Sequence, residues 1–222
     1  MTIVVHHLEH SRSIRALWLL EELGLSYTLK TYQRTKRFRA PPELSKVHPL
    51  GRAPVVEVDG EMLAESGAII EYFAEREGQL RPEGGSALLA YRFFLHYAEG
   101  SAMPPLLVQL IVERIKKTKA PFFVKPIIKK IADGVEEGFT REAIDTHFGF
   151  VNDTLGAHPY FAGDDFSGAD IQMYYACEAA RSRGGAHWPN IDAWITRVTA
   201  REAFARALDK GGPAIPKKRS AA

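Results

Sequence analysis

The chain has 222 residues, 45% of them hydrophobic and 25% charged, with a formal net charge of +2. This composition is typical of a folded globular protein with one large or two small domains, and it excludes disordered and collagen-like chains. The near balance of basic and acidic residues gives no field that would attract nucleic acid, so we expect no nucleic-acid partner.

The cysteine content and the amino-terminal residues indicate the cellular location of the protein. Cys177 is the single cysteine, which excludes an intramolecular disulfide, a CxxC redox pair and a cysteine zinc site. The histidines show no metal-ligand spacing, so we expect no metal. Residues 1–5 lack the regions of a signal peptide, and no apolar run approaches the about 20 residues of a membrane span. We therefore expect a cytoplasmic location and no membrane partner.

Residues 1–80 mix strand and helix signals. Strand signals, either β-branched runs or apolar alternation, occur at residues 3–7, 27–32, 54–58 and 61–64. Helical signals occur over residues 13–23, from 41–44 onward and from Ser66, which we expect to cap its helix. The Asp59-Gly60 turn joins the last two strands as a hairpin. The predicted order is β-α-β-α-β-β-α.

A linker rich in glycine and proline, residues 79–86, precedes a region with helical periodicity throughout. Its helical stretches are expected over residues 87–115, interrupted by Pro104-Pro105, and over 122–155, 169–183 and 189–207. Ser167 and Asp170 have the spacing of a capping box before the third stretch. We predict an α/β domain at 1–80 and an all-α domain at 87–222.

Four segments with matched order and spacing carry a resemblance to a known family: residues 11–23 (SRSIRALWLLEEL), 48–55 (HPLGRAPV), 63–70 (LAESGAII) and 166–171 (FSGADI). Together they resemble the glutathione transferase family over nearly the whole chain, in a fungal and bacterial branch with serine near the amino-terminus. The resemblance implies a thioredoxin-like first domain, an all-helical second domain, a homodimer, and glutathione bound at the edge of the first domain.

Glu65 and Ser66 open a predicted helix, whose free first-turn amides and dipole attract an anion. With the resemblance, we expect Ser66 to bind the γ-glutamyl carboxylate of glutathione and Glu65 to pair with the adjacent ammonium. Taken alone, the two residues are also explained as a helix cap and a first-turn charge.

The loop before the third strand supplies the remaining glutathione contacts. The resemblance implies a cis peptide bond before Pro54, with the Ala53 backbone pairing with the cysteinyl unit as in strand addition. If the resemblance is set aside, the alternative is an ordinary trans peptide bond before Pro54 at the start of the strand. Arg52 is a candidate for the glycine carboxylate, with Arg39 and His48 as further candidates.

Catalysis requires glutathione as a thiolate, and a free thiol has a pKa of about 8.5. A hydroxyl that donates to sulfur at a helix N-terminus lowers that pKa. Ser11 and Ser13 both precede the first helix. Serine-type relatives carry the pattern Ser-x-x-(Ser or Cys)-Arg, and Arg15 in this role selects Ser11, although Ile14 departs from the pattern. Ser13 stays the alternative, and both serines are also explained as helix caps.

The second substrate is expected between the domains, along the first long helix of the all-α domain. Tyr91, Phe94 and Tyr97 would line this pocket, with Glu99 near the same face, although such an aromatic stripe is also typical of a core. The leading function is conjugation of glutathione to small electrophiles, as in detoxification, with glutathione a substrate and no cofactor. The alternatives are a glutathione-dependent peroxidase or disulfide reductase, and a non-catalytic glutathione-binding module.

Overall fold

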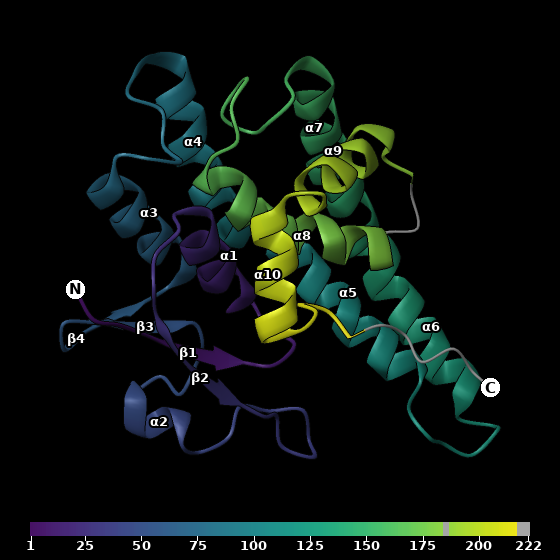
Figure 1. Ribbon diagram of the computed structural model, residues 1–222. Helices are drawn as coiled ribbons and strands as arrows, with labels where there is room; N and C mark the ends of the chain where they lie inside the picture. Colours follow the sequence, from purple (N-terminus) through teal and green to yellow (C-terminus); the bar gives the residue numbers. More distant parts are fainter. Residues whose placement is uncertain (184–186, 217–222) are drawn as a thin grey trace.

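The computed structural model of the protein describes residues 1–183 and 187–216 (Figure 1). Its amino-terminal part holds a four-stranded sheet of β1 (Ile3–Leu8), β2 (Thr28–Tyr32), β3 (Val55–Val58) and β4 (Glu61–Ala64). The strand order is β2-β1-β3-β4, with β1 parallel to β2 and antiparallel to β3, and β3 antiparallel to β4. The helices of this part are α1 (Ile14–Glu22), α2 (Leu44–Val47) and α3 (Ser66–Glu77). The predicted β-α-β-α-β-β-α order is confirmed.

The second part is helical, as predicted, within the described residues. Its α-helices are α4 (Gly85–Tyr97), α5 (Met103–Lys116), α6 (Lys125–Val135), α7 (Arg141–Ala157), α8 (Gly168–Arg183), α9 (Pro189–Thr199) and α10 (Glu202–Gly211). Residues 184–186 and 217–222 of the predicted second domain lie outside the described residues. No helix in the described part of the chain is long and apolar enough to span a membrane.

Two π-helical turns connect successive helices: η1 (Ala98–Ala102) joins α4 to α5, and η2 (Glu136–Thr140) joins α6 to α7. The predicted interruption at Pro104-Pro105 is confirmed, because both prolines lie in the first turn of α5, directly after η1. Proline has no amide hydrogen to donate to the preceding turn, so the regular α-helical ladder cannot pass through this point.

The prediction of one helical stretch over 189–207 is wrong in one respect, because the helix is interrupted between α9 and α10. Arg201 is extended there, with φ −70° and ψ 135°. Its guanidinium makes two hydrogen bonds of 2.6 and 2.8 Å to the carboxylate of Glu22 at the end of α1. The break turns α10 back so that it packs along α1 (Figure 1).

Apolar and charged contacts fasten α10 to α1. The ring of Phe204 lies edge-on to that of Trp18, with 4.8 Å between ring centroids. Glu21, only 8% exposed, accepts hydrogen bonds from Arg206, Lys210 and the hydroxyl of Tyr27. A buried carboxylate is stable only when several donors surround it. Burial acts to raise the pKa of Glu21, but these hydrogen bonds outweigh it and lower the pKa.

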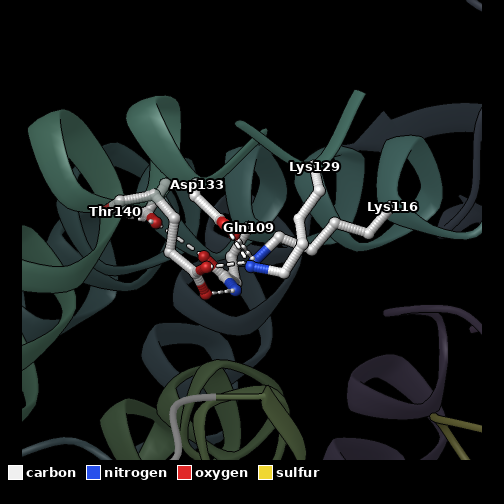
Figure 2. A network of polar contacts seen from close by, with 6 residues as sticks. Gln109, Lys116, Lys129, Asp133 and Thr140 are labelled. Carbon is white, nitrogen blue, oxygen red and sulfur yellow. Dashed lines mark hydrogen bonds and ion pairs between the residues drawn. The ribbon is translucent and has the colours of Figure 1, made fainter. Parts of the chain in front are cut away.

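A polar network holds α5, α6 and η2 together (Figure 2). Lys116 forms ion pairs with Asp133, at 2.8 Å, and with Glu136. Gln109 donates to Glu136 at 2.8 Å and accepts from the hydroxyl of Thr140 at 2.6 Å. Gln109 and Thr140 are buried, so their mutual hydrogen bond satisfies polar groups that water does not reach.

The predicted capping box at the start of α8 is confirmed. The Ser167 amide donates to Asp170 Oδ2 at 2.9 Å, and Oδ1 of Asp170 accepts from Trp194 Nε1 at 2.9 Å and from the Phe161 amide at 3.2 Å. Asp170 therefore joins α8, α9 and the loop before α8. Burial raises the pKa of Asp170 to about 6, although its hydrogen bonds oppose that rise.

Replacing Asp170 with alanine leaves several buried donors without an acceptor. We expect Asp170→Ala to lower the free energy of unfolding by about 3 kcal/mol or more. Urea unfolding followed by circular dichroism measures this. The matched control is Asp165→Ala, an exposed aspartate of the preceding loop, which should stay within about 0.5 kcal/mol of wild type. Equal effects of both substitutions would show that the Asp170 network adds no stability.

Candidate active site

A cavity of about 380 Å³ lies where the sheet meets α3 and η1. Its lining residues are Arg12, His48, Leu50, Arg52, Ala53, Pro54, Ala64, Glu65, Ser66 and Glu99. Six of the predicted glutathione residues therefore surround one cavity: His48, Arg52, Ala53, Pro54, Glu65 and Ser66. Arg39 is not among the lining residues, and its amide bonds instead to the Thr35 hydroxyl in an exposed loop.

Strand register explains why these distant residues meet. In the β3–β4 hairpin Val55 pairs with Ala64, so Pro54, just before Val55, lies beside Glu65, just after Ala64. In the β1–β3 pair His6 lies opposite Val55. The loop that follows β1 therefore reaches the same end of the sheet. The peptide bond between Ala53 and Pro54 is cis, as the family resemblance implied.

The start of α3 differs in one detail from the prediction. Glu65 occupies the N-cap position with φ +70° and ψ 120°, a backbone conformation that non-glycine residues adopt rarely. Ser66 is the first helical residue, and no side chain caps the helix. The expected cap by Ser66 is therefore wrong, because Ser66 lies one position past the N-cap. Its hydroxyl instead accepts a hydrogen bond from Arg15 Nη1 at 3.1 Å. The first-turn amides of α3 still have no intrahelical partner.

Buried Arg15 and half-buried Glu99 form the floor of this corner. The Arg15 side chain is fully buried, and its Nη1 lies 2.6 Å from Glu99 Oε1. Arg12 pairs with the same carboxylate oxygen at 2.9 Å. Burial lowers the pKa of Arg15, and Glu99 opposes that effect. Sequence reasoning placed Glu99 near the second substrate and missed the contact of Arg15 with Ser66. The available signal was the position of Arg15 in the apolar first turns of its helix.

Ser11 and Ser13 lie in the turn between β1 and α1, with 2.7 Å between their hydroxyl oxygens. Ser13 is fully buried, and its hydroxyl contacts His7 Nδ1 at 2.9 Å and accepts the Leu8 amide at 3.0 Å. Ser11 keeps 8% of its surface exposed and is not itself a lining residue, but its neighbour Arg12 lines the cavity. The Ser13 side chain does not cap α1.

Two of the three aromatic residues expected around the second substrate belong to the core. Tyr91 is fully buried and Phe94 is 3% exposed, both within the hydrophobic core, which corrects the expectation for these two residues. Their spacing serves packing against α8 and its neighbours. Phe94 also borders a separate cavity of about 810 Å³ that holds none of the glutathione candidates. Tyr97 is half-buried and bonds to His147 Nδ1 at 2.7 Å, so its role stays a prediction.

Metal ligands are not assembled anywhere in the two described ranges. Within residues 1–183 and 187–216, no group of three or more His, Cys, Asp or Glu side chains is arranged to hold a metal ion. Cys177 is fully buried, and burial raises the pKa of its thiol. A buried thiol with a raised pKa is a small apolar group rather than a nucleophile.

Neutralising Glu99 tests the pairing of its carboxylate with buried Arg15. Glu99→Gln leaves the Arg15 charge in the interior without a counter-charge, so we expect the free energy of unfolding to fall by about 3 kcal/mol. The double variant Arg15→Met/Glu99→Gln removes both charges and should recover part of the loss. Urea unfolding of the four proteins of this cycle measures the coupling, with exposed Glu142→Gln as control. Additive losses would contradict the pairing.

Comparison with known sequences assigns the family. The sequence model of the glutathione S-transferase N-terminal domain matches residues 2–75, and that of the C-terminal domain matches residues 113–197. Glutathione S-transferase 1 of Saccharomyces cerevisiae is 35% identical, over 94% of this chain and 94% of the yeast protein. Glutathione S-transferase 3 of Schizosaccharomyces pombe is 33% identical, over 94% of this chain and 87% of that protein. Both are fungal, in agreement with the predicted branch.

Solved structures agree in fold. A glutathione S-transferase from Actinobacillus pleuropneumoniae has a TM-score of 0.78 and 27% identity, over 99% of this chain and 97% of that one. A glutathione transferase homologue from Sulfitobacter, solved with bound glutathione, has a TM-score of 0.74 and 21% identity, over 96% and 99% of the two chains. Residues 11–23, 48–55, 63–70 and 166–171 thus resembled the correct family, and the chain belongs to the glutathione S-transferases.

Proposed function

We propose that the protein is a glutathione transferase that binds glutathione between Arg52 and the Glu65-Ser66 corner, activates its thiol with Ser11, and transfers the sulfur to a small electrophile. The observation that carries this function is the single cavity lined by the cis-proline loop, the start of α3 and Glu99. The similarity to two fungal glutathione S-transferases over most of the chain supports the reaction class.

The charges around the cavity complement those of glutathione, which has two carboxylates and one ammonium. Glu65 and Glu99 face the ammonium, and the γ-glutamyl carboxylate binds Ser66 and the free amides at the positive end of α3. The glycine carboxylate pairs with Arg52, with His48 on the same lining. Arg39 has no part in this arrangement, because it lies outside the cavity. The backbone of Ala53-Pro54 pairs with the cysteinyl unit.

Burial and hydrogen bonding favour Ser11 over Ser13 as the thiol-activating residue. Ser13 has no exposed surface, and the protein already surrounds its hydroxyl with His7 and Leu8. Ser11 retains exposed surface and adjoins Arg12 at the cavity. Its hydroxyl donates to the Leu8 carbonyl at 2.8 Å in the described state and needs only a rotation about one bond to donate to sulfur.

The reaction has two steps at one place. The bound thiol loses its proton to solvent, and the resulting thiolate is stabilised by the Ser11 hydroxyl, the positive end of α1 and the Arg12 charge. The sulfur lone pair then forms a bond to the electrophilic carbon while the leaving group departs with its bonding electrons. With an activated double bond, the sulfur adds to one carbon, and the carbanion formed at the other takes a proton from solvent. Holding both partners together supplies the remaining acceleration. With a peroxide as the second substrate, the same thiolate would attack oxygen and break the O–O bond. The leaving oxygen would take a proton, and the sulfur would be oxidised to a sulfenic acid, which a second glutathione reduces by forming a disulfide and releasing water.

The assembly and setting follow the family. We propose a homodimer, because apolar side chains of α4 and α5 remain exposed on the single chain: Leu89 at 69%, Phe93 at 47%, Leu107 at 52% and Ile111 at 49%. Exposed apolar patches of this kind mark protein–protein contacts. We also propose that the enzyme is cytoplasmic and acts in detoxification, which agrees with the conjugation of small electrophiles.

The function is tested first by a pH titration of the ultraviolet thiolate band of bound glutathione. In wild type the thiolate band should appear at pH values well below the pKa of the free thiol. Ser11→Ala should raise the bound thiol pKa by about one to two units and lower kcat about 10- to 100-fold, because it removes a hydrogen bond to a charged sulfur. Exposed Ser86→Ala is the control. No thiolate band in wild type would leave only the non-catalytic binding module.

A second prediction separates binding from activation. Glu65→Gln should raise the KM for glutathione about tenfold by removing the counter-charge of the ammonium, with little change in the bound thiol pKa. Steady-state kinetics and calorimetric titration measure it. The control is Glu61→Gln, an exposed glutamate of the adjoining strand β4 that lies outside the cavity lining. Equal KM values in the two variants would contradict the role given to Glu65.

A further inference from the structure

His7 lies at the centre of a hydrogen-bond chain that joins the serine turn to α10. The residue is 1% exposed on β1. Its Nε2 is 2.8 Å from the carbonyl oxygen of Gly211, at the end of α10, and its Nδ1 is 2.9 Å from the Ser13 hydroxyl. Both ring nitrogens are therefore engaged by the protein, so His7 is not placed to touch glutathione.

The chemistry of the partners fixes the proton on the ring. A carbonyl oxygen only accepts hydrogen bonds, so Nε2 of His7 carries a hydrogen and donates to Gly211. Burial lowers the pKa of His7, although the bond to the Gly211 carbonyl opposes this, so the neutral ring is favoured at neutral pH. In a neutral imidazole the other nitrogen is an acceptor. Nδ1 therefore takes the one hydroxyl hydrogen that Ser13 has.

The orientation of Ser13 determines that of Ser11. With its hydrogen directed to His7, the Ser13 oxygen can act only as an acceptor, and it already accepts the Leu8 amide at 3.0 Å. In the 2.7 Å contact between the two hydroxyls the hydrogen then comes from Ser11, which shares it with the Leu8 carbonyl at 2.8 Å. The Ser11 oxygen is in turn held by the Ser13 amide at 3.1 Å. The Ser11 hydrogen is thus the one left free to move between nearby acceptors.

We propose that His7 is a positioning residue, which through Ser13 keeps Ser11 as the hydrogen-bond donor to the glutathione sulfur. Without the Nδ1 acceptor, Ser13 would direct its hydrogen to Ser11 or to the Leu8 carbonyl, the same carbonyl to which Ser11 donates, and the orientation of Ser11 would no longer be set. Gly211, near the carboxyl end of the chain, supplies the carbonyl that holds Nε2 of His7. A Cβ at Gly211 would lie 2.5 Å from Leu17 Cδ1 and 3.1 Å from His7 Nε2, so a side chain there would push α10 off the ring.

Two substitutions separate positioning from simple support of the fold. In His7→Asn, the side-chain oxygen replaces Nδ1 as acceptor for Ser13, and the bond to Gly211 is lost. In His7→Gln, the amide nitrogen replaces Nε2 as donor to Gly211, and the acceptor for Ser13 is lost. His6→Gln is the control, because His6 is on the same strand but points to the opposite face and bonds to the Tyr32 hydroxyl.

The readouts are the bound thiol pKa, kcat and KM for glutathione, and the free energy of unfolding. We expect His7→Gln to raise the bound thiol pKa by about one unit and to lower kcat about tenfold near neutral pH, with KM within about twofold of wild type. His7→Asn should keep a thiol pKa close to wild type despite any loss of stability. Equal thiol pKa values in His7→Gln and wild type, or equal shifts in both His7 variants, would overturn the role.

A measurement on the unmodified protein serves if a variant fails to fold. Nitrogen NMR of the His7 ring should show a neutral imidazole with its hydrogen on Nε2, and a ring with its hydrogen on Nδ1 would overturn the inference. Because the inference rests on the proposed function, Ser11→Ala is measured alongside. An unchanged thiol pKa in Ser11→Ala rejects Ser11 itself, whereas a shift in Ser11→Ala without one in His7→Gln rejects only His7.

Discussion

The enclosure of α1 on all sides is the constraint on which the site depends. The sheet, α3, α8 and α10 surround this helix, and its residues from Ile14 to Glu21 are all buried. A charged group in such a helix must meet a partner within the protein, since water does not reach it. Near the start of α1, Arg15 bonds to Ser66 and Glu99 at the cavity. Near its end, Glu21 bonds to Arg206 and Lys210 of α10. These contacts fix the orientation of the helix at both ends.

The site is consequently assembled from both halves of the molecule. The sheet contributes the cis-proline loop and the start of α3, whereas η1 contributes Glu99 and α10 contributes the carbonyl that fixes His7. Arg12 and Arg15 share Glu99 and lie near one aromatic ring, Tyr175, at 5.2 and 5.7 Å from its centroid. Positive charge is thereby concentrated beside the serine turn, where a thiolate would be stabilised, while its counter-charge lies on the opposite domain.

Sequence reasoning succeeded where the signal is local or follows a short motif. Alternation, turn glycines and the Ser167–Asp170 box predicted the elements, and the segment around Glu65 and Ser66 indicated the family. Other features depend on residues far apart in the chain. The sequence around Glu99 contains no signal that it pairs with Arg15. The helical spacing of aromatic residues such as Tyr91 is the same whether they face a core or a pocket. The cap expected from Ser66 was wrong because the helix begins at Ser66 itself, and the Arg15 side chain that donates to its hydroxyl lies on α1, far away in the sequence.

The contact between His7 and Gly211 spans 204 positions of sequence, and it bears on when the protein becomes active. During synthesis the chain emerges from its amino-terminus, so β1 and the serine turn are made long before α10. A nascent or truncated chain that lacks α10 has no carbonyl to select the His7 tautomer and no cover over α1. The part of thiol activation that depends on His7 therefore arises only after α10 has been made and packed against β1 and α1.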